Sequence, residues 1–333
     1  MIIVTGGAGF IGSNFILKWI SSSKEPILNI DCLTYAANLD NLKEAEEDKR
    51  YSFSQTNISN QKDIFKLLKN NKPRAILNFA AESHVDRSIV GPENFIRTNI
   101  IGTYSLLEAS LKYWNNLAGK EKKDFRFFHI STDEVFGSLN LHDKKSTEES
   151  PYKPNSPYSA SKAASDHLVR AWHHTFRLPT LISNCTNNYG PHQHEEKLIP
   201  LIITKALKNE NLPIYGDGKN IRDWLYVEDH CVAIMKILES GNQGETYNIG
   251  GNCEKNNLEV VIEICKILDS QKPKKDGSSY EKQIKFVKDR PGHDFRYSLD
   301  ITKIKNDLNW MPKESFSTGL EKTVQWHLKK VII

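Results

Sequence analysis

The chain has 333 residues, of which 38% are hydrophobic, enough to bury a large core divided over about two domains. Its net charge of +4 comes from 45 basic and 41 acidic residues spread along the chain, which disfavours a nucleic-acid surface. Five cysteines without C-x-x-C spacing disfavour a disulfide framework or a zinc site, and no apolar run could span a membrane, so we expect a soluble cytoplasmic protein.

Short apolar runs alternate with longer amphipathic segments through the first half of the chain. They predict strands at residues 2–4, 27–30, 51–54, 75–79, 125–130 and 180–183, separated by helices. The first of these strands leaves no room for a secretory signal peptide. This alternation predicts an α/β fold with a Rossmann-type doubly wound parallel sheet.

Two long helices are expected within this half. Apolar residues near helical spacing predict one helix over residues 94–114. Ser156 and Pro157 supply an N-cap and a first-turn proline for a second helix over residues 156–176. Tyr158 therefore falls in the first turn of that second helix.

After about residue 183 the alternation gives way to segments punctuated by proline, glycine and asparagine. We expect a cofactor-binding domain over residues 1–186, to which a later segment of about 220–250 returns. Residues 187–333 are expected to form mainly a smaller, C-terminal substrate-binding domain. The polar, lysine-rich stretch 270–288 is interpreted as an exposed connection leading into a short strand at 284–287.

A glycine-rich turn follows the first predicted strand. Gly6, Gly9 and Gly12 fit the pattern G-x-x-G-x-x-G, and Gly7, Gly9 and Gly12 fit the pattern G-x-G-x-x-G. Either register places bare backbone N–H groups at a helix N-terminus, where a pyrophosphate can bind. Asp31 follows the second strand, and a carboxylate there accepts ribose hydroxyls and repels a 2′-phosphate, which favours NAD over NADP.

The segment after the fourth strand lies at the edge where such sheets bind ligands. The small residues Ala80 and Ala81 would let a cofactor approach the backbone. His84 and Asp86 have ligand chemistry, but no second cluster at suitable spacing accompanies them. No metal site is expected.

Two residue pairs carry the chemistry. Tyr158 and Lys162 are four residues apart on one helix face, and an ammonium beside a phenol favours the phenolate needed for alcohol–ketone redox reactions. Asp133 and Glu134 directly follow Thr132. One carboxylate that takes a proton from carbon, beside a carboxylic acid that protonates a departing hydroxyl, can remove water next to a ketone.

These features together resemble the extended short-chain dehydrogenase/reductase family. Longer strings at residues 80–88, 131–135, 196–201, 221–230 and 289–294 are similar to the dTDP-glucose 4,6-dehydratases and span nearly the whole chain. The resemblance implies conversion of dTDP-glucose to dTDP-4-keto-6-deoxyglucose and water, with bound NAD, by C4 oxidation, C5/C6 dehydration and C6 reduction. It also implies a homodimer formed through the two long helices.

The resemblance assigns roles to five residues. Tyr158, supported by Lys162, takes the sugar O4 proton, and Thr132 hydrogen-bonds that oxygen. Glu134 removes the C5 proton, and protonated Asp133 donates to the leaving C6 hydroxyl. Opposite roles for adjacent carboxyls require environments that separate their pKa values.

Further contacts are implied by the same resemblance. The cofactor-binding residues are Gly6, Gly9, Phe10, Ile11, Gly12, Asp31, Asn57, Ile58, Ala80, Ala81, Asn99, Tyr158, Lys162 and Asn188. The substrate-binding residues are Ser83, Asn187, Lys197, Leu198, Pro213, Tyr215, Arg222, Asn257, Arg290 and His293. Arg222 and Arg290 suit a bidentate grip on a diphosphate. For Asn99, a bracing role between helices is the alternative.

Two positions depart from the family pattern, and three other functions stay open. Asn57 stands where the family commonly has Asp, and Phe136 stands where Tyr is common. A UDP-glucose 4,6-dehydratase would share the whole mechanism, since thymine and uracil differ by one methyl group. A nucleotide-sugar 4-epimerase would not need the acid pair after Thr132. A catalytically silent NAD-binding protein would be expected to lack one of the intact catalytic groups.

Overall fold

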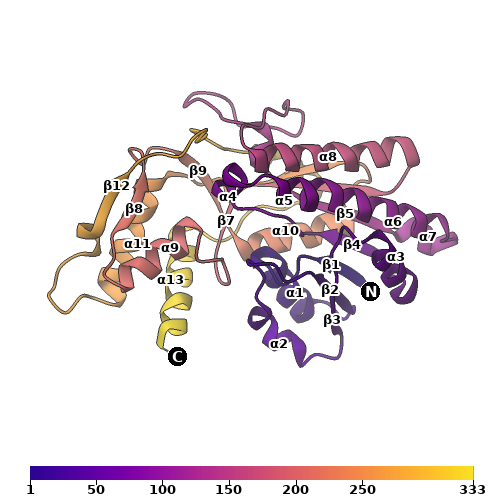
Figure 1. Cartoon of the computed structure of the whole chain (residues 1–333), viewed down its shortest axis with the longest axis horizontal. Coiled ribbons are helices and arrows are strands. Elements are labelled where there is room, and N and C mark those ends of the chain that lie inside the picture. The colour runs from indigo at the N-terminus through magenta and orange to yellow at the C-terminus, as the bar shows by residue number, and fades with distance from the viewer. Residues whose placement is uncertain (333) are drawn as a thin grey trace.

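The computed structural model describes residues 1–332, which form two lobes (Figure 1). The first lobe is built on a seven-stranded sheet in which every pairing is parallel. From one edge to the other its strands are β10 (Thr246–Ile249), β6 (Thr180–Cys185), β5 (Arg126–Thr132), β4 (Ala75–Asn78), β1 (Ile2–Thr5), β2 (Ile27–Asp31) and β3 (Tyr51–Gln55). The predicted doubly wound sheet is confirmed, and each of the six predicted strands overlaps an observed one.

Helices cover both faces of this sheet, because successive apolar residues along each strand point to opposite faces. The helices are α1 (Phe10–Ser22) and α10 (Val227–Ser240) on one face, and α3 (Gln61–Asn71), α6 (Thr103–Asn115) and α8 (Pro157–Phe176) on the other. In β1, Ile2 and Val4 pack into the α1–α10 layer, whereas Ile3 packs into the α3–α6 layer. Buried strands of this kind read as unbroken apolar runs.

The second lobe has its own apolar core. Its strands are β7 (Asn187–Tyr189), β8 (Leu212–Tyr215), β9 (Ile221–Tyr226), β11 (Glu254–Asn256) and β12 (Ile284–Val287), and its longer helices are α9 (Leu198–Leu207), α11 (Asn257–Gln271) and α13 (Phe316–Ile332). The strand predicted at residues 284–287 is β12, which pairs with β8. Of the segment of about 220–250, β9 lies in this lobe, whereas α10 and β10 pack with the first lobe.

The helix predicted over residues 94–114 is continuous but irregular. It begins as α5 (Glu93–Phe95), widens into the π-helical segment η2 (Ile96–Gly102) and continues as α6. Within η2 the carbonyl of Asn99 accepts a hydrogen bond from the Ser165 hydroxyl at 2.6 Å. A π-helical turn inside an α-helix commonly marks a functional position.

The N-terminus of α8 follows the prediction. Ser156 and Ser159 form a reciprocal capping box, and Pro157 occupies the first turn. The shorter helices are η1 (Leu39–Leu42), α2 (Lys43–Glu46), α4 (Val85–Val90), α7 (Gly119–Asp124), η3 (Asp133–Phe136), η4 (Tyr280–Gln283) and α12 (Thr302–Leu308). Within residues 1–332, no helix has the length and apolar character needed to cross a membrane.

Candidate active site

A long cavity runs along the carboxyl ends of β1, β4 and β5 and reaches the second lobe. It begins where the strand order reverses between β1 and β4, the place at which open α/β sheets bind ligands. The predicted residues that line it are Gly6, Gly9, Phe10, Ile11, Gly12, Asp31, Asn57, Ile58, Ala80, Ala81, Ser83, Thr132, Asp133, Glu134, Tyr158, Lys162, Asn187, Asn188 and Lys197.

The glycine-rich turn forms one end of the cavity. Gly6 has φ +70°, and a Cβ added to it would lie 2.6 Å from the Ala80 backbone. A Cβ on Gly12 would collide with the carbonyl oxygen of Gly6. The turn and the start of α1 can therefore approach one another only without side chains, leaving a cradle of backbone N–H groups that fits a pyrophosphate.

Replacing Gly12 with alanine is expected to weaken NAD binding at least about tenfold, because α1 must move away from the turn and its N–H groups leave the pyrophosphate. The measurement is NAD content and the dissociation constant for added NAD, with circular dichroism to check folding. Gly91→Ala is the matched control, because its added Cβ would meet no atom within 4 Å. Unchanged NAD affinity in Gly12→Ala would contradict this account of the turn.

Asp31 lies at the end of β2 and is 8% exposed. Its two carboxylate oxygens accept hydrogen bonds from the backbone N–H groups of Ala8 at 3.0 Å and Leu33 at 2.8 Å. Burial raises the pKa of Asp31, and these amides oppose the increase. The carboxyl thus shapes the glycine turn and also faces the cavity where adenosine ribose would lie.

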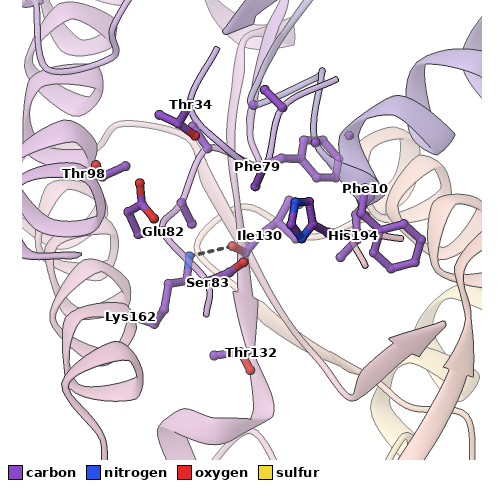
Figure 2. Close-up of a pocket in the computed structure, with 18 of the residues that line it drawn as sticks. Phe10, Thr34, Phe79, Glu82, Ser83, Thr98, Ile130, Thr132, Lys162 and His194 are labelled. Atoms are coloured by element: carbon purple, nitrogen blue, oxygen red, sulfur yellow. Dashed lines mark hydrogen bonds between the residues drawn. The ribbon is translucent and has the colours of Figure 1, made fainter. Parts of the chain in front are cut away.

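Figure 2 shows Lys162 reaching from α8 towards the carbonyl of Ile130 on β5, near Thr132. Lys162 Nζ donates to that carbonyl at 2.9 Å and lies 3.3 Å from Nε2 of His129. Burial raises the pKa of Tyr158 well above its usual range, and the carboxyl of Glu134 adds to this effect. The Lys162 ammonium faces β5 and burial disfavours the charged phenol, so a phenolate supported by Lys162 together with the nicotinamide charge stays a prediction.

Asp133 and Glu134 occupy different electrostatic environments. Burial and the neighbouring Glu134 raise the pKa of Asp133 well above its usual range. Burial also raises the pKa of Glu134, but the positive charges of Arg290, Arg222 and Lys197 oppose that increase. Asp133 therefore holds its proton more strongly, whereas three cations favour the carboxylate form of Glu134.

Hydrogen bonding adds to this contrast. The Thr132 hydroxyl donates to Oδ1 of Asp133 at 3.2 Å and accepts from the backbone N–H of Glu134 at 3.3 Å. Oδ2 of Asp133 is buried and has no partner among the described residues. A protonated Oδ2 could donate to a bound hydroxyl at this position.

Only three of the predicted substrate-binding residues line the cavity. Ser83 and Lys197 are joined, since Lys197 Nζ donates to the Ser83 carbonyl at 2.9 Å. Oδ1 of Asn187 is buried and has no protein partner, so it can accept from a ligand. The residues that do not line this cavity are Leu198, Pro213, Tyr215, Arg222, Asn257, Arg290 and His293.

Two of these seven residues, Arg222 and Arg290, still lower the pKa of Glu134 through their positive charge. Arg222 is 5% exposed and donates to the carbonyls of Ile221, Asp294 and Phe295 at 2.7, 3.0 and 3.3 Å, so its guanidinium is already held by backbone. Arg290 lies 3.5 Å from a carboxylate oxygen of Asp86, and its buried Nε has no protein partner. Arg290 is therefore the freer of the two to bind a phosphate.

Asn99 was expected as a cofactor contact, but its side chain does not line the cavity. It accepts from the N–H of Glu82 at 2.9 Å, and it donates to the Glu82 carbonyl at 3.0 Å and to the Ser161 hydroxyl at 2.8 Å. These bonds use its amide to tie the loop after β4 to α8. These bonds fit the bracing alternative, and the cofactor contact of Asn99 stays a prediction.

Sequence reasoning missed a buried charged residue behind the catalytic pair. Asp166 is fully buried and accepts hydrogen bonds from Ser131 and Tyr152, both at 2.9 Å. The available signal was its spacing, because Tyr158, Lys162 and Asp166 follow one another at intervals of four residues along α8. Lys162 and Asp166 therefore share the face of α8 that contacts β5.

A cluster of residues that sequence reasoning did not connect lies next to segments that line the cavity. Arg87 of α4 forms two hydrogen bonds of 3.0 Å with Glu196 and lies 3.8 Å from the ring centre of Tyr35. His84 lies 3.2 Å from the same glutamate. The three segments that carry these residues are far apart in the sequence and meet beside the cavity.

Comparisons with known proteins agree with this geometry. Residues 3–323 match the family described as GDP-mannose 4,6 dehydratase. The chain is similar to a dTDP-glucose 4,6-dehydratase of Xanthomonas campestris, with 55% identity over 326 residues, 98% of this chain and 92% of the relative.

Solved structures give the same picture. DesIV, a dTDP-glucose 4,6-dehydratase of Streptomyces venezuelae solved with NAD bound, has a TM-score of 0.89 and 42% identity, covering 98% of this chain and 97% of its own. A UDP-glucose 4-epimerase of Thermotoga maritima has a TM-score of 0.87 but only 27% identity, covering 99% of each chain. The fold is therefore shared with epimerases, whereas the sequence is closer to the dehydratases.

Proposed function

The chain belongs to the GDP-mannose 4,6-dehydratase family, and we propose that within it this protein is a dTDP-glucose 4,6-dehydratase that uses bound NAD. The observation that carries the proposal is the pair of a buried Asp133 and a partly buried Glu134, held beside Thr132 and Tyr158 in environments that affect their pKa values differently. Relatives named for this activity, at 55% identity for the one from Xanthomonas campestris, support it.

NAD would fit between the glycine turn and Lys162, and when bound it would take a hydride from C4 of the glucose and later return it to C6. Tyr158 accepts the O4 proton as the C4 alcohol becomes a ketone, and Thr132 donates a hydrogen bond to that oxygen. Because burial disfavours a charged phenol, the positive charge of the bound nicotinamide is needed beside Lys162 to favour the phenolate.

The acid pair then removes water. The C4 ketone acidifies the C5 proton, which Glu134 accepts as a carboxylate favoured by Arg222, Arg290 and Lys197. Asp133 donates its proton to the C6 hydroxyl, and the C6–O bond breaks with release of water. With NAD bound, Glu134 would return its proton to C5 as the hydride returns to C6. Tyr158 then loses the O4 proton and Asp133 regains a proton, so the net change is the loss of one water molecule.

The proposal is tested by incubating the purified protein with dTDP-glucose and UDP-glucose in parallel and following 4-keto-6-deoxy sugar by mass spectrometry and NMR. Loss of water from dTDP-glucose, with little from UDP-glucose, is expected. Preference for UDP-glucose would keep the mechanism and change the substrate. Absence of dehydration with NAD bound would overturn the proposal, and inversion at C4 would identify an epimerase.

We also propose that the protein is a cytoplasmic homodimer. The helices η2, α6 and α8 run side by side along one face of the first lobe (Figure 1). Ile101 and Tyr104 on them are 47% and 41% exposed, and Phe176 at the end of α8 is 44% exposed. Val169 of α8 is fully buried in the core and is not part of this exposed surface. The exposed apolar side chains fit a second copy of the chain.

Mass measurement at micromolar concentration is expected to return a dimer. Replacing Ile101 with glutamate should give a monomer, because a charged group would be buried in the interface without a partner. Leu141→Glu is the control, since Leu141 is 55% exposed and lies outside these helices. A wild-type protein that is only monomeric would defeat the proposal.

A further inference from the structure

Three ionisable side chains are buried together between α8 and β5. Lys162, His129 and Asp166 are 3%, 0% and 0% exposed. Lys162 and Asp166 are one turn apart on α8, and His129 of β5 lies between them. Nε2 of His129 is 3.3 Å from Lys162 Nζ and 3.4 Å from Oδ1 of Asp166.

Asp166 is held as a carboxylate. Its Oδ2 accepts from the Ser131 and Tyr152 hydroxyls, each at 2.9 Å, and from the amide of Asn184 at 3.2 Å. Burial favours the neutral acid, but His129, Lys162 and Ser131 together lower the pKa of Asp166 below its usual value. Because three donors are directed at Oδ2, the carboxylate form is favoured over the protonated acid.

The hydrogen bonds of Asn78 assign the tautomer of His129. The Thr5 hydroxyl donates to Oδ1 of Asn78 at 2.7 Å, so the Asn78 amide group is directed at Nδ1 of His129, 3.2 Å away. Nδ1 is therefore the acceptor, and the ring proton is on Nε2, facing Asp166. Burial lowers the pKa of His129 to about 4, so the ring is neutral at physiological pH.

This tautomer decides what holds Lys162. Because Nε2 of His129 carries a proton, it cannot accept from the ammonium, and the Ile130 carbonyl is the acceptor. Burial lowers the pKa of Lys162 to about 8, whereas Asp166 and Cys185 oppose this decrease. Burial raises the pKa of Cys185 to about 12, so this thiol is neutral and Asp166 supplies the negative charge.

Resting on the proposed function, we infer that Asp166 is a positioning residue that acts through Lys162: its carboxylate, buried one helical turn away, holds the lysine as an ammonium that donates to the Ile130 carbonyl of β5. The other titratable groups on this side of the site are Tyr158 of α8 and the η3 carboxyls Asp133 and Glu134. Among the described residues, only Asp166 and Cys185 oppose the decrease in the pKa of Lys162.

The test compares Asp166→Asn with wild type in dTDP-glucose dehydration. We expect kcat to fall roughly 10–100-fold, as when a residue that orients a reacting group is lost, with KM changed less than about twofold because Asp166 does not touch the sugar. Without the carboxylate, Lys162 loses its proton at lower pH. The decline of kcat with rising pH should therefore begin at lower pH than in wild type, whose Lys162 has a pKa of about 8.

Asp229→Asn is the matched control. Asp229 is a buried carboxyl of α10 that accepts backbone N–H groups of Lys313 and Glu314 at 2.9 and 2.8 Å, does not line the cavity and does not shift the pKa of Lys162. Its kcat and pH profile should equal those of wild type. In Asp166→Asn, an unchanged pH profile, or a rise of KM parallel to the fall of kcat, would overturn the inference.

A double variant guards against misfolding and against failure of the proposed function. Thermal unfolding of Lys162→Met, Asp166→Asn and their combination needs no substrate. We expect the double variant to be more stable than Asp166→Asn alone, because no unpaired buried cation is left. Its kcat should equal that of Lys162→Met. A double variant less stable than either single variant, or less active than Lys162→Met, shows that Asp166 does not act through Lys162.

Discussion

Replacing Glu134 with glutamine is expected to stop the reaction after sugar oxidation, with dehydration slowed by about 10²–10⁴-fold. Glutamine keeps the size of the side chain but cannot accept the C5 proton. Tyr158, Thr132 and Lys162 are untouched, so oxidation at C4 still takes place. Reduced nicotinamide should therefore accumulate on the enzyme when dTDP-glucose is added.

This result is measured by the absorbance of bound reduced nicotinamide, together with quenched-flow mass spectrometry of the sugar. Glu148→Gln is the matched control, since Glu148 is a partly buried carboxyl that accepts the N–H of Asn248 at 2.8 Å, outside the cavity. The control should turn over normally. Normal dehydration in Glu134→Gln would remove Glu134 as the C5 base.

Replacing Tyr158 with phenylalanine is expected to block C4 oxidation, the step that precedes dehydration. The variant lacks the oxygen that takes the O4 proton, so C4 oxidation should fall by about 10²–10⁴-fold. Reduced nicotinamide should not accumulate, in contrast to Glu134→Gln.

Tyr113→Phe controls for loss of a buried phenol. The Tyr113 hydroxyl donates to the Pro73 carbonyl at 3.2 Å in the first lobe, outside the cavity. Its loss should affect stability alone. Rapid nicotinamide reduction in Tyr158→Phe would require another base for O4, and the two variants together would then assign no order to the steps.

Local signals predicted the fold and one side of the site well. The strands were predictable because burial on both faces makes them rich in apolar residues: residues 2–4 are all apolar, and residues 27–30 are apolar except for Asn29. The glycine turn and the start of α8 were predictable because Gly6, Gly12 and Ser156 have local steric or capping roles. These features depend on neighbours a few residues away.

Other features depend on partners distant in the sequence, so spacing could not predict them. Lys162 and Tyr158 share a helix face, but the Ile130 carbonyl decides where the ammonium lies. Asn99 matched a cofactor position, yet the wide turn of η2 directs its amide to Glu82. Arg222 matched a diphosphate ligand, but three carbonyls hold its guanidinium.

The return of β10 to the large sheet limits how the protein can be assembled. Residues 246–249 pair with β6, so β6 has an open edge until the ribosome has also made β7, α9, β8 and β9 of the second lobe. A fragment ending near residue 186 would expose that edge and lack α10, whose Cys231, Ile234 and Ile237 complete the core beside α1. The two lobes therefore cannot be obtained as separate folded fragments by a single cut in the chain.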